Sequence, residues 1–284
     1  PEEPVEVQHG EQTQAYLLQT AAMQIHIDRQ TGRLRMEDAL GNLLQEDKQS
    51  FSAVESLNKG VTRVQIDKRI QASEDFFGLG DKSGRLQLRG QRLQNWNTDA
   101  FAYGADSDPL YRSIPFFFGL QEGRAYGLLL DNTYRSTFDF GHQLEDSLQI
   151  SAEGGEMVYY FIQGDSLTEV AEHYARLTGR PELPPLWTLG YHQCRWSYFP
   201  DSRVREVADN FREKEIPCDA IYLDIDYMDG YRCFTWNRGR FPDPAGLVEY
   251  LRKAGFHTIV MIDPGIKVER GFEVGKALVK PGIG

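Results

Sequence analysis

The sequence has few cysteines and no long apolar run, and each absence excludes a class of protein. Its three cysteines form neither a CxxC pair nor a Cys/His spacing; they are Cys194, Cys218 and Cys233. We therefore expect ordinary thiols rather than a disulfide framework or a zinc site. No run of about 18 apolar residues occurs, so no membrane-spanning helix is expected. We expect no metal site and no cofactor.

Basic residues are outnumbered in this chain of 284 residues. It carries 31 lysines and arginines against 42 aspartates and glutamates, which gives a formal net charge of −11. A protein that follows a phosphate backbone needs a basic stripe, and an anionic membrane surface would repel this charge. We therefore expect neither nucleic acid nor a membrane as partner, whereas a neutral molecule such as a sugar is compatible with this balance.

No secretory leader is recognisable at the start of the sequence. The chain begins at Pro1 rather than at a methionine, so a leader could have been removed. The compartment stays open, with a slight preference for the cytoplasm over secretion, and the oligomeric state is also open.

Residues 1 to about 164 have the pattern of β-structure, because short segments alternate apolar and polar side chains between turn residues. In the segment Met23–Asp28 every second residue is apolar, and a turn leads from it into a second short strand. Two hairpins are expected, one joining 114–120 to 126–130 and the other joining 148–150 to 157–162. Many short strands at this spacing predict an antiparallel β-sandwich.

The pattern changes near residue 165. The segment Ser166-Leu-Thr-Glu169 forms a capping box, in which a serine hydroxyl and a glutamate satisfy free N–H groups at the start of a helix. Gly179 and Pro181 end that helix. We therefore predict an N-terminal β-sandwich domain with a linker helix over residues 1–181 and a second domain over residues 182–284.

The second domain alternates strands with helices. The expected elements are a strand over 187–195, a helix capped by Asp201 or Ser202, a strand over 220–223, a helix that begins at Asp243-Pro244, and a strand over 258–262. Such alternation predicts a parallel sheet. Residues 268–284 offer no fourth strand, and a (β/α)₈ TIM barrel needs about 250 residues. We expect the first three strands of a barrel, and hence one segment of a longer protein.

Each of the three expected strands ends in a bulky or charged group. These ends are Cys194-Arg195-Trp196, Asp224-Ile225-Asp226 and Asp263-Pro264. Ligands bind at the carboxyl edge of parallel strands, and an aromatic ring beside carboxylates suits a sugar. Polar residues are also ordinary in loops of this kind, so the spacing does not identify a reaction.

At these residues the sequence resembles glycoside hydrolase family 31. The resemblance rests on Leu189-Gly-Tyr-His-Gln-Cys-Arg-Trp-Ser-Tyr198, on Asp224-Ile-Asp-Tyr-Met-Asp229 followed by Phe234-Thr-Trp236, and on Ile262-Asp-Pro-Gly-Ile266. Upstream, it continues in Gly78-Leu-Gly-Asp81, Trp96-Asn-Thr-Asp99 and the segment 108–115. The matches run in order from about residue 76 to residue 266, and they imply an α-glucosidase-like enzyme with a β-sandwich before its barrel.

The resemblance also implies roles for single residues. Asp224 matches the residue that hydrogen-bonds the far hydroxyls of the sugar in the −1 subsite, and Asp99 matches an aspartate on a sandwich loop that reaches the substrate. Apolar or aromatic lining positions of the subsite are matched by Trp196, Ile225 and Ile266.

Four further residues at the strand ends have plainer interpretations. Asp226 and Asp263 are expected to be supports or turn caps. Arg195 is expected to pair with an acidic neighbour, and His192 to be a satisfied core histidine.

Retaining glycosidases need two carboxyl groups about 5–5.5 Å apart. In the family, both are aspartates on later barrel strands, and residues 1–284 contain neither motif, so no catalytic residue is assigned in this segment. Asp224 and Asp263 cannot replace them, because nothing in the sequence raises the pKa of one over the other.

The resemblance therefore implies that the complete protein releases terminal α-linked glucose from oligosaccharides with retention, and that this segment alone is inactive. Transglycosylation, linkage and chain-length preference stay open. The alternatives are another family 31 activity, such as an α-xylosidase, or a non-catalytic carbohydrate-binding protein.

Overall fold

The computed structural model describes residues 5–55 and 62–278, and the chain divides into two compact units, Pro1–Arg180 and Pro181–Gly284. The first unit is built almost entirely of antiparallel strands, and the second contains three parallel strands with helices. No helix in these described ranges is long and apolar enough to cross a membrane.

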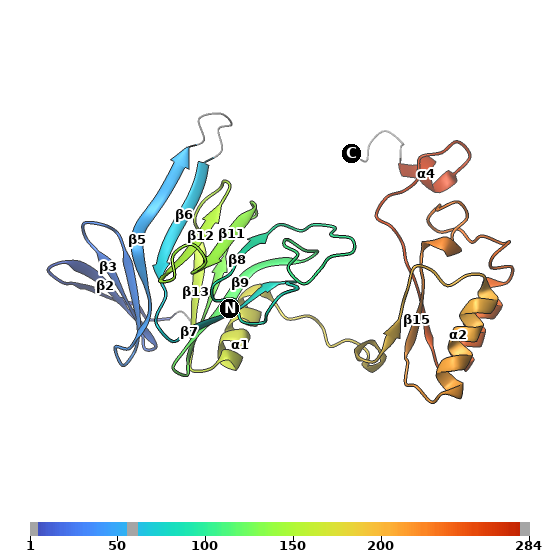
Figure 1. Ribbon diagram of the computed structural model, residues 1–284, viewed down its shortest axis with the longest axis horizontal. Coiled ribbons are helices and arrows are strands. Elements are labelled where there is room, and N and C mark those ends of the chain that lie inside the picture. Colours follow the sequence, from blue (N-terminus) through green and yellow to red (C-terminus); the bar gives the residue numbers. More distant parts are fainter. Residues whose placement is uncertain (1–4, 56–61, 279–284) are drawn as a thin grey trace. The chain divides into compact units, whose positions relative to one another are not determined.

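The first unit is a sandwich of two sheets (Figure 1). The nine-stranded sheet has the order β1 (Gln8–Glu11), β2 (Ala15–Gln19), β3 (Met23–Asp28), β4 (Leu34–Asp38), β5 (Leu43–Glu55), β6 (Thr62–Arg69), β12 (Ser147–Ala152), β11 (Ser136–Phe140) and β8 (Arg92–Asn95). The four-stranded sheet has the order β13 (Tyr159–Gly164), β10 (Arg124–Leu130), β9 (Ser113–Gln121) and β7 (Glu74–Gly80). All neighbouring strands of both sheets are antiparallel, so the antiparallel sandwich predicted from the sequence is confirmed.

One of the two predicted hairpins is wrong. Strands β9 and β10 form the first hairpin as expected. Strand β12, however, pairs with β6 and β11 in the nine-stranded sheet, whereas β13 pairs with β10 in the four-stranded sheet. The segment Glu153-Gly-Gly-Glu156, between β12 and β13, thus carries the chain from one sheet to the other.

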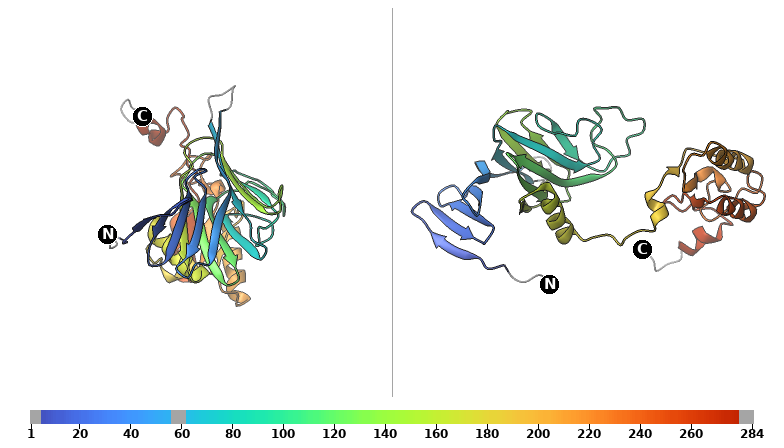
Figure 2. Two further views of the ribbon diagram at one scale, coloured as in Figure 1. Left: turned by 90° about the vertical axis from the view of Figure 1, so that its left-hand side faces the viewer. Right: turned by 90° about the horizontal axis from the view of Figure 1, so that it is seen from below.

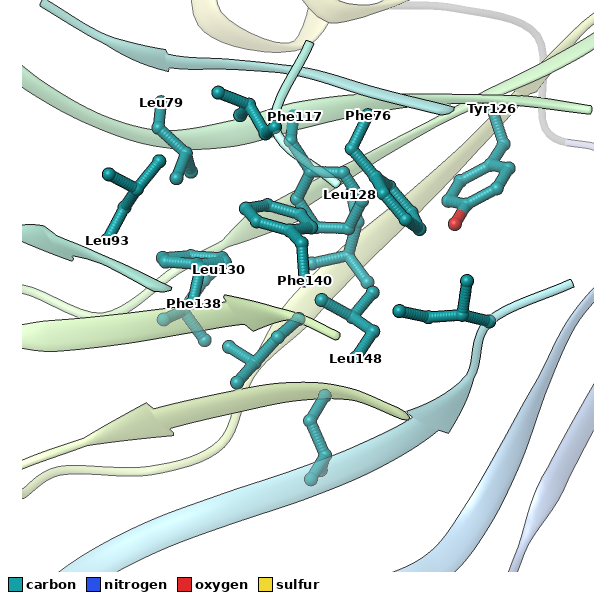
Figure 3. Packing of buried hydrophobic residues seen from close by; sticks show 14 residues of the cluster. Phe76, Leu79, Leu93, Phe117, Tyr126, Leu128, Leu130, Phe138, Phe140 and Leu148 are labelled. Carbon is teal, nitrogen blue, oxygen red and sulfur yellow. The ribbon is translucent and has the colours of Figure 1, made fainter. Parts of the chain in front are cut away.

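The core of the sandwich is rich in phenylalanine. Rings from three different strands meet at its centre: Phe76 lies 4.9 Å from Phe140 and Phe117 lies 5.2 Å from Phe140, measured between ring centroids. Figure 3 shows these rings between the two sheets together with Leu128 and Leu148. Apolar residues of strands β6 to β13 point into this layer, whereas β1 to β5 contribute none of its residues, so the two sheets pack face to face over this part of the unit.

Helix α1 (Leu167–Thr178) covers the outer face of the four-stranded sheet (Figure 2). Ser166 is its N-cap and accepts a hydrogen bond from the Glu169 N–H, while the Glu169 carboxylate accepts one from the Asp165 N–H. The helix lies close to the sheet because β10 carries Gly127 there, where a Cβ atom would come within 2.9 Å of a Val170 methyl group.

The second unit holds the parallel sheet β14 (His192–Gln193), β15 (Ala220–Leu223) and β16 (His257–Val260). Helices α2 (Asp201–Glu213) and α3 (Pro244–Lys253) pack with the side chains of Ile221 and Leu223 in one apolar cluster. This helix–strand alternation is the start of a TIM barrel, as the sequence predicted. Asp243 caps α3 by accepting a hydrogen bond from the Gly246 N–H, and Pro244 occupies the first helical position, also as expected.

Two local predictions for this unit are wrong. The apolar run 187–195 forms a 3₁₀ helix, η1 (Leu186–Leu189), before the two-residue strand β14, and the Trp187 ring stacks on His257 at 4.0 Å instead of extending the strand. The N-cap of α2 is Pro200, which makes no side-chain cap, so neither Asp201 nor Ser202 has that role.

The parallel sheet is open on both sides. Within the described ranges neither β14 nor β16 has a further partner strand, and the chain after β16 forms only the short helix α4 (Glu273–Leu278). The sheet is therefore three strands wide here, and the prediction of an incomplete barrel fits this arrangement.

Candidate functional site

The carboxyl ends of β14, β15 and β16 bring together the segments that the sequence singled out. The chain continues from β15 into the 3₁₀ helix η2 (Ile225–Tyr227), and hydrogen bonds join its loop to the segment after β16. The Tyr227 hydroxyl donates to the Met261 carbonyl at 3.0 Å, and the Cys233 thiol contacts the Gly265 carbonyl at 3.5 Å.

Asp224 stands at the tip of β15. Its Oδ1 accepts a hydrogen bond of 2.7 Å from the Ile225 N–H and so caps η2. Side chains alternate along a strand, so Asp224 shares a face with Tyr222, whereas Ile221 and Leu223 point towards α2 and α3. The residue is half-buried, and no other described residue hydrogen-bonds its carboxylate. One carboxylate oxygen thus remains available to a ligand hydroxyl.

Asp226 is the anchor of the site. It is 8% exposed and accepts hydrogen bonds from Trp196 Nε1 at 3.1 Å, Ser197 Oγ at 2.7 Å, Arg240 Nη1 at 3.0 Å and the Tyr231 hydroxyl at 3.4 Å. Burial raises the pKa of this carboxyl group, but the hydrogen bonds from Ser197, Arg240 and Trp196 outweigh burial and lower it overall. Asp226 is therefore held ionised, which suits an anchor and not a proton donor.

The indole of Trp196 is presented to solvent by this anchor. The residue is 68% exposed although its Nε1 is bonded to Asp226. A ring held at its edge and open on its faces can pack against the C–H face of a sugar. Ile225 and Ile266 are half-buried, and both pack on the apolar cluster beneath the loops.

The structure thus gathers four of the five predicted binding residues in the second unit. Asp99 belongs to the first unit, on the loop between β8 and β9, where it is exposed. It lies beside Tyr111, whose pKa is raised by burial and by the Asp99 charge. That Asp99 reaches a sugar bound at the barrel stays a prediction.

Three neighbouring predictions have mixed outcomes. His192 is half-buried, and both of its ring nitrogens lie within hydrogen-bond distance of an oxygen, the Tyr222 hydroxyl at 3.3 Å and the Trp187 carbonyl at 3.2 Å. Arg195 was expected to pair with an acid, but it forms no ion pair with a described carboxylate. Its guanidinium lies 6.0 Å from the centroid of the Tyr198 ring. Asp263 is exposed in the loop after β16.

Sequence reasoning missed two features of this site. Arg240 and Tyr231 reach Asp226 from a loop whose path no periodicity predicts. The Cys194 thiol lies near Asp224, and its pKa is raised by burial and by that carboxylate. Among the described residues, no group of three or more His, Cys, Asp or Glu side chains could hold a metal ion.

Two models of known protein families together match most of the chain. A family model described as the glycosyl hydrolases family 31 TIM-barrel domain matches residues 181–283. A second model, described as the glycosyl hydrolase 31 N-terminal galactose mutarotase-like domain, matches residues 1–139.

Individual relatives extend the likeness. Alpha-glucosidase 2 of Bacillus thermoamyloliquefaciens is 40% identical over 93% of this chain and 33% of its own length. An alpha-glucosidase of Saccharolobus solfataricus is 35% identical over 79% of this chain and 33% of its own length. The chain thus spans about one third of the length of these two curated relatives.

Solved structures show the same relationship. A family 31 dextranase of Flavobacterium johnsoniae, solved in complexes with glucose and with isomaltotriose, superposes with a TM-score of 0.83 at 36% identity. The match covers 95% of this chain and 32% of the dextranase.

Proposed function

The chain belongs to glycosyl hydrolase family 31, and we propose that the complete protein is a retaining α-glucosidase that releases terminal α-linked glucose from oligosaccharides. Both alpha-glucosidase relatives support this activity. The observation that carries it is the half-buried Asp224 carboxylate at the tip of β15, with one oxygen unbonded among the described residues, in the same rim as the exposed Trp196 ring.

In the proposed mechanism, residues of this segment bind the sugar, and residues of the remaining polypeptide carry out the chemical steps. A carboxylate nucleophile attacks the anomeric carbon while a carboxylic acid protonates the leaving oxygen, and water then hydrolyses the glucosyl-enzyme ester. We expect both groups outside residues 1–284. Asp224 accepts hydrogen bonds from sugar hydroxyls, and such bonds strengthen as the ring flattens towards the oxocarbenium-like transition state.

The test is Asp224→Ala in the complete protein, assayed on nitrophenyl α-glucoside. We expect a loss of about 2–4 kcal/mol in transition-state binding, the size of a charged hydrogen bond in a desolvated site, which is roughly a 30- to 1,000-fold drop in kcat/KM.

The matched control is Asp219→Asn. Asp219 directly precedes β15, at the opposite end of the strand from the rim, so this change should leave kcat/KM nearly unaltered. A drop of less than about threefold for Asp224→Ala would contradict its role, because a hydrogen bond to a charged group is worth about 1.5–3 kcal/mol, which is more than tenfold.

Cleavage of α-1,6-linked glucan is a second candidate, favoured by the likeness to the dextranase. Rates on maltotriose, isomaltotriose and dextran would separate the two, and nitrophenyl α-xyloside would test the α-xylosidase alternative. A complete protein that binds these sugars but hydrolyses none would favour the non-catalytic alternative.

A further inference from the structure

A small hollow lies on the nine-stranded sheet, over the neighbouring strands β6, β12, β11 and β8 (Figure 1). Its volume is about 180 Å³, which is below the roughly 300–1,000 Å³ of pockets for drug-sized molecules. It therefore suits a small ligand or one group of a larger ligand. Polar residues alone line it, and they include Arg63, Arg92 and Arg135. We call it the arginine hollow.

The register of the sheet places this hollow on the face that points away from the core. Leu93 on β8 and Ile150 on β12 belong to the core of the sandwich. Because side chains alternate between the two faces of a sheet, the next residues along these strands, Gln94 and Ser151, point away from the core and line the hollow. The three arginines come from β6, from β8 and from the position directly before β11. They are far apart in the sequence and meet only in the folded sheet.

No ion pair joins any of the three guanidiniums to a carboxylate of the described residues, in a chain with 42 acidic and 31 basic residues. Asp139 stands directly opposite Arg92 on the ladder, but its Oδ1 accepts hydrogen bonds from the N–H groups of His142 and Gln143. Glu153 is the one acid among the described lining residues. The hollow therefore has a net positive charge in an acidic protein, and an anion would relieve the mutual repulsion of the arginines.

Neutral groups hold two of the arginines in place. The Arg63 Nη2 group donates a hydrogen bond of 3.3 Å to the Oγ of Ser151, which is only 4% exposed. The guanidinium of Arg135 lies 5.2 Å from the centroid of the Trp96 ring. A guanidinium has five N–H donors, so these contacts leave most donors of each arginine free. Side chains that are already held lose less conformational entropy when a ligand binds.

The number and placement of the donors indicate the kind of anion. Guanidinium groups bind carboxylate and phosphate groups through paired N–H···O bonds. A carboxylate offers two oxygens in one plane, whereas a phosphate group offers three strong acceptor oxygens that point in different directions. Three arginines that approach from separate strands therefore fit a phosphate group better than a carboxylate.

We propose that the arginine hollow binds a phosphate group, as free phosphate or as the phosphate of a sugar phosphate. Arg63 and Arg135 bind its oxygens from two sides, and Arg92 supplies the third guanidinium. The charge of Glu153 opposes binding and so limits the affinity. The proposal does not rest on the proposed function, because the hollow is formed within the first unit alone.

Calorimetry on the complete protein, with inorganic phosphate as the probe, tests this binding. At low ionic strength we expect a dissociation constant of about 1 mM or lower. Added sodium chloride should weaken the binding, because salt screens exposed charges. Arg63→Ala and Arg135→Ala should each weaken it by about tenfold or more, since each removes a hydrogen bond between charged groups.

Glucose 6-phosphate distinguishes the two sources of the phosphate group. The titration is run with 1-deoxynojirimycin in saturating amount, so that a glucosyl site at the barrel is occupied. A dissociation constant equal to or lower than that of inorganic phosphate would assign the hollow to sugar phosphates, and a higher one would assign it to free phosphate. In both cases the two alanine variants should weaken the binding.

Two matched variants test the role of charge. Arg85→Ala removes the same charge from an exposed position outside the hollow, so phosphate binding should stay within about twofold of wild type. Glu153→Gln should tighten phosphate binding, because it removes the negative charge of the described lining.

Melting temperature gives an independent readout. Phosphate should raise the Tm of the wild-type protein by mass action, but not that of the Arg63→Ala/Arg135→Ala double variant. Without phosphate, the double variant should melt close to the wild type, since neither guanidinium has an ion pair to lose among the described residues. The proposal is overturned if the wild type shows no saturable phosphate binding at low ionic strength. It is also overturned if both alanine variants bind phosphate as tightly as the wild type does.

Discussion

At the scale of single residues, Glu74 is the most unusual ionisable group of the sandwich. It is 1% exposed; one carboxylate oxygen accepts a 2.7 Å bond from the Tyr126 hydroxyl and the other accepts a 2.8 Å bond from the Gln71 N–H. Burial raises its pKa from 4.5 to about 7, against the opposing effect of these two bonds and of Arg89. The group therefore titrates near neutral pH inside a packed core.

This pKa makes the stability of the sandwich depend on pH. Because the folded-state pKa of Glu74 lies above the unfolded value, its contribution is fully present below about pH 4.5 and is lost as pH rises through about 7. A shift from 4.5 to about 7 corresponds to at most about 3.4 kcal/mol. Urea unfolding of the segment 1–180 at pH 6 and pH 8.5 should show lower stability at the higher pH.

The control is Glu74→Gln, which keeps the shape and removes the charge. We expect its stability to change less between these two pH values than that of the wild type. Equal pH dependence in the two proteins would refute the assignment. Glu122→Gln, at an exposed surface position, should behave like wild type.

At the scale of elements, Asp226 joins the loops that follow β14 and β15. Through Trp196 and Ser197 it holds the first loop, and through Arg240 it holds the approach to α3. A single carboxylate therefore sets the orientation of the Trp196 ring, which no strand or helix supports by itself.

Loss of the Asp226 carboxylate should free the Trp196 ring to move and so weaken sugar binding more than it slows the catalytic step. We expect Asp226→Ala to raise KM more than it lowers kcat, with a fall in kcat/KM of about 10- to 100-fold, the size of one or two charged hydrogen bonds. Steady-state kinetics of the complete protein with nitrophenyl α-glucoside would measure this. Asp229→Asn is the control, since the Asp229 carboxylate is exposed and forms only a long ion pair, of 3.6 Å, with Arg232. Unchanged kinetics in Asp226→Ala would rule out the positioning role.

The elements that could be predicted from the sequence are those that are determined by residues close together in the chain. The β3–β4 and β9–β10 hairpins follow from alternation and a turn within a few residues. Strand β12 pairs instead with β6, some 80 residues earlier in the chain, at Ile150 and Ile66, and no local pattern encodes that choice. The prediction of a strand over 187–195 was wrong for a similar reason, because Trp187 stacks on His257, which is distant in the sequence.

The residues of the candidate site also differ in whether the sequence could place them. Asp224 could be placed from the sequence because parallel strands align their carboxyl ends at one edge. The partners of Asp226 could not, because Arg240 and Tyr231 arrive through irregular loops.

At the scale of the whole molecule, the two units differ in how completely they bury their apolar surface. The sandwich has a closed core between two sheets, with α1 covering a further apolar face. The second unit buries one face of its sheet under α2 and α3 but leaves large apolar side chains exposed, among them Leu186, Leu189 and Ile262. Parallel sheets occur almost only with both faces covered, and an exposed sheet edge can pair with a further strand.

The two segments should therefore behave differently when made separately. We expect residues 1–180 to be monomeric and to unfold cooperatively, because their core is self-contained. Residues 181–284 should self-associate, since the uncovered edges of β14 and β16 and the exposed apolar residues attract further copies. Size-exclusion chromatography with light scattering on each segment would check both expectations. A monomeric, cooperatively folding 181–284 would mean that three strands with two helices suffice as a domain, and the case for barrel strands supplied by further polypeptide would lose its physical basis.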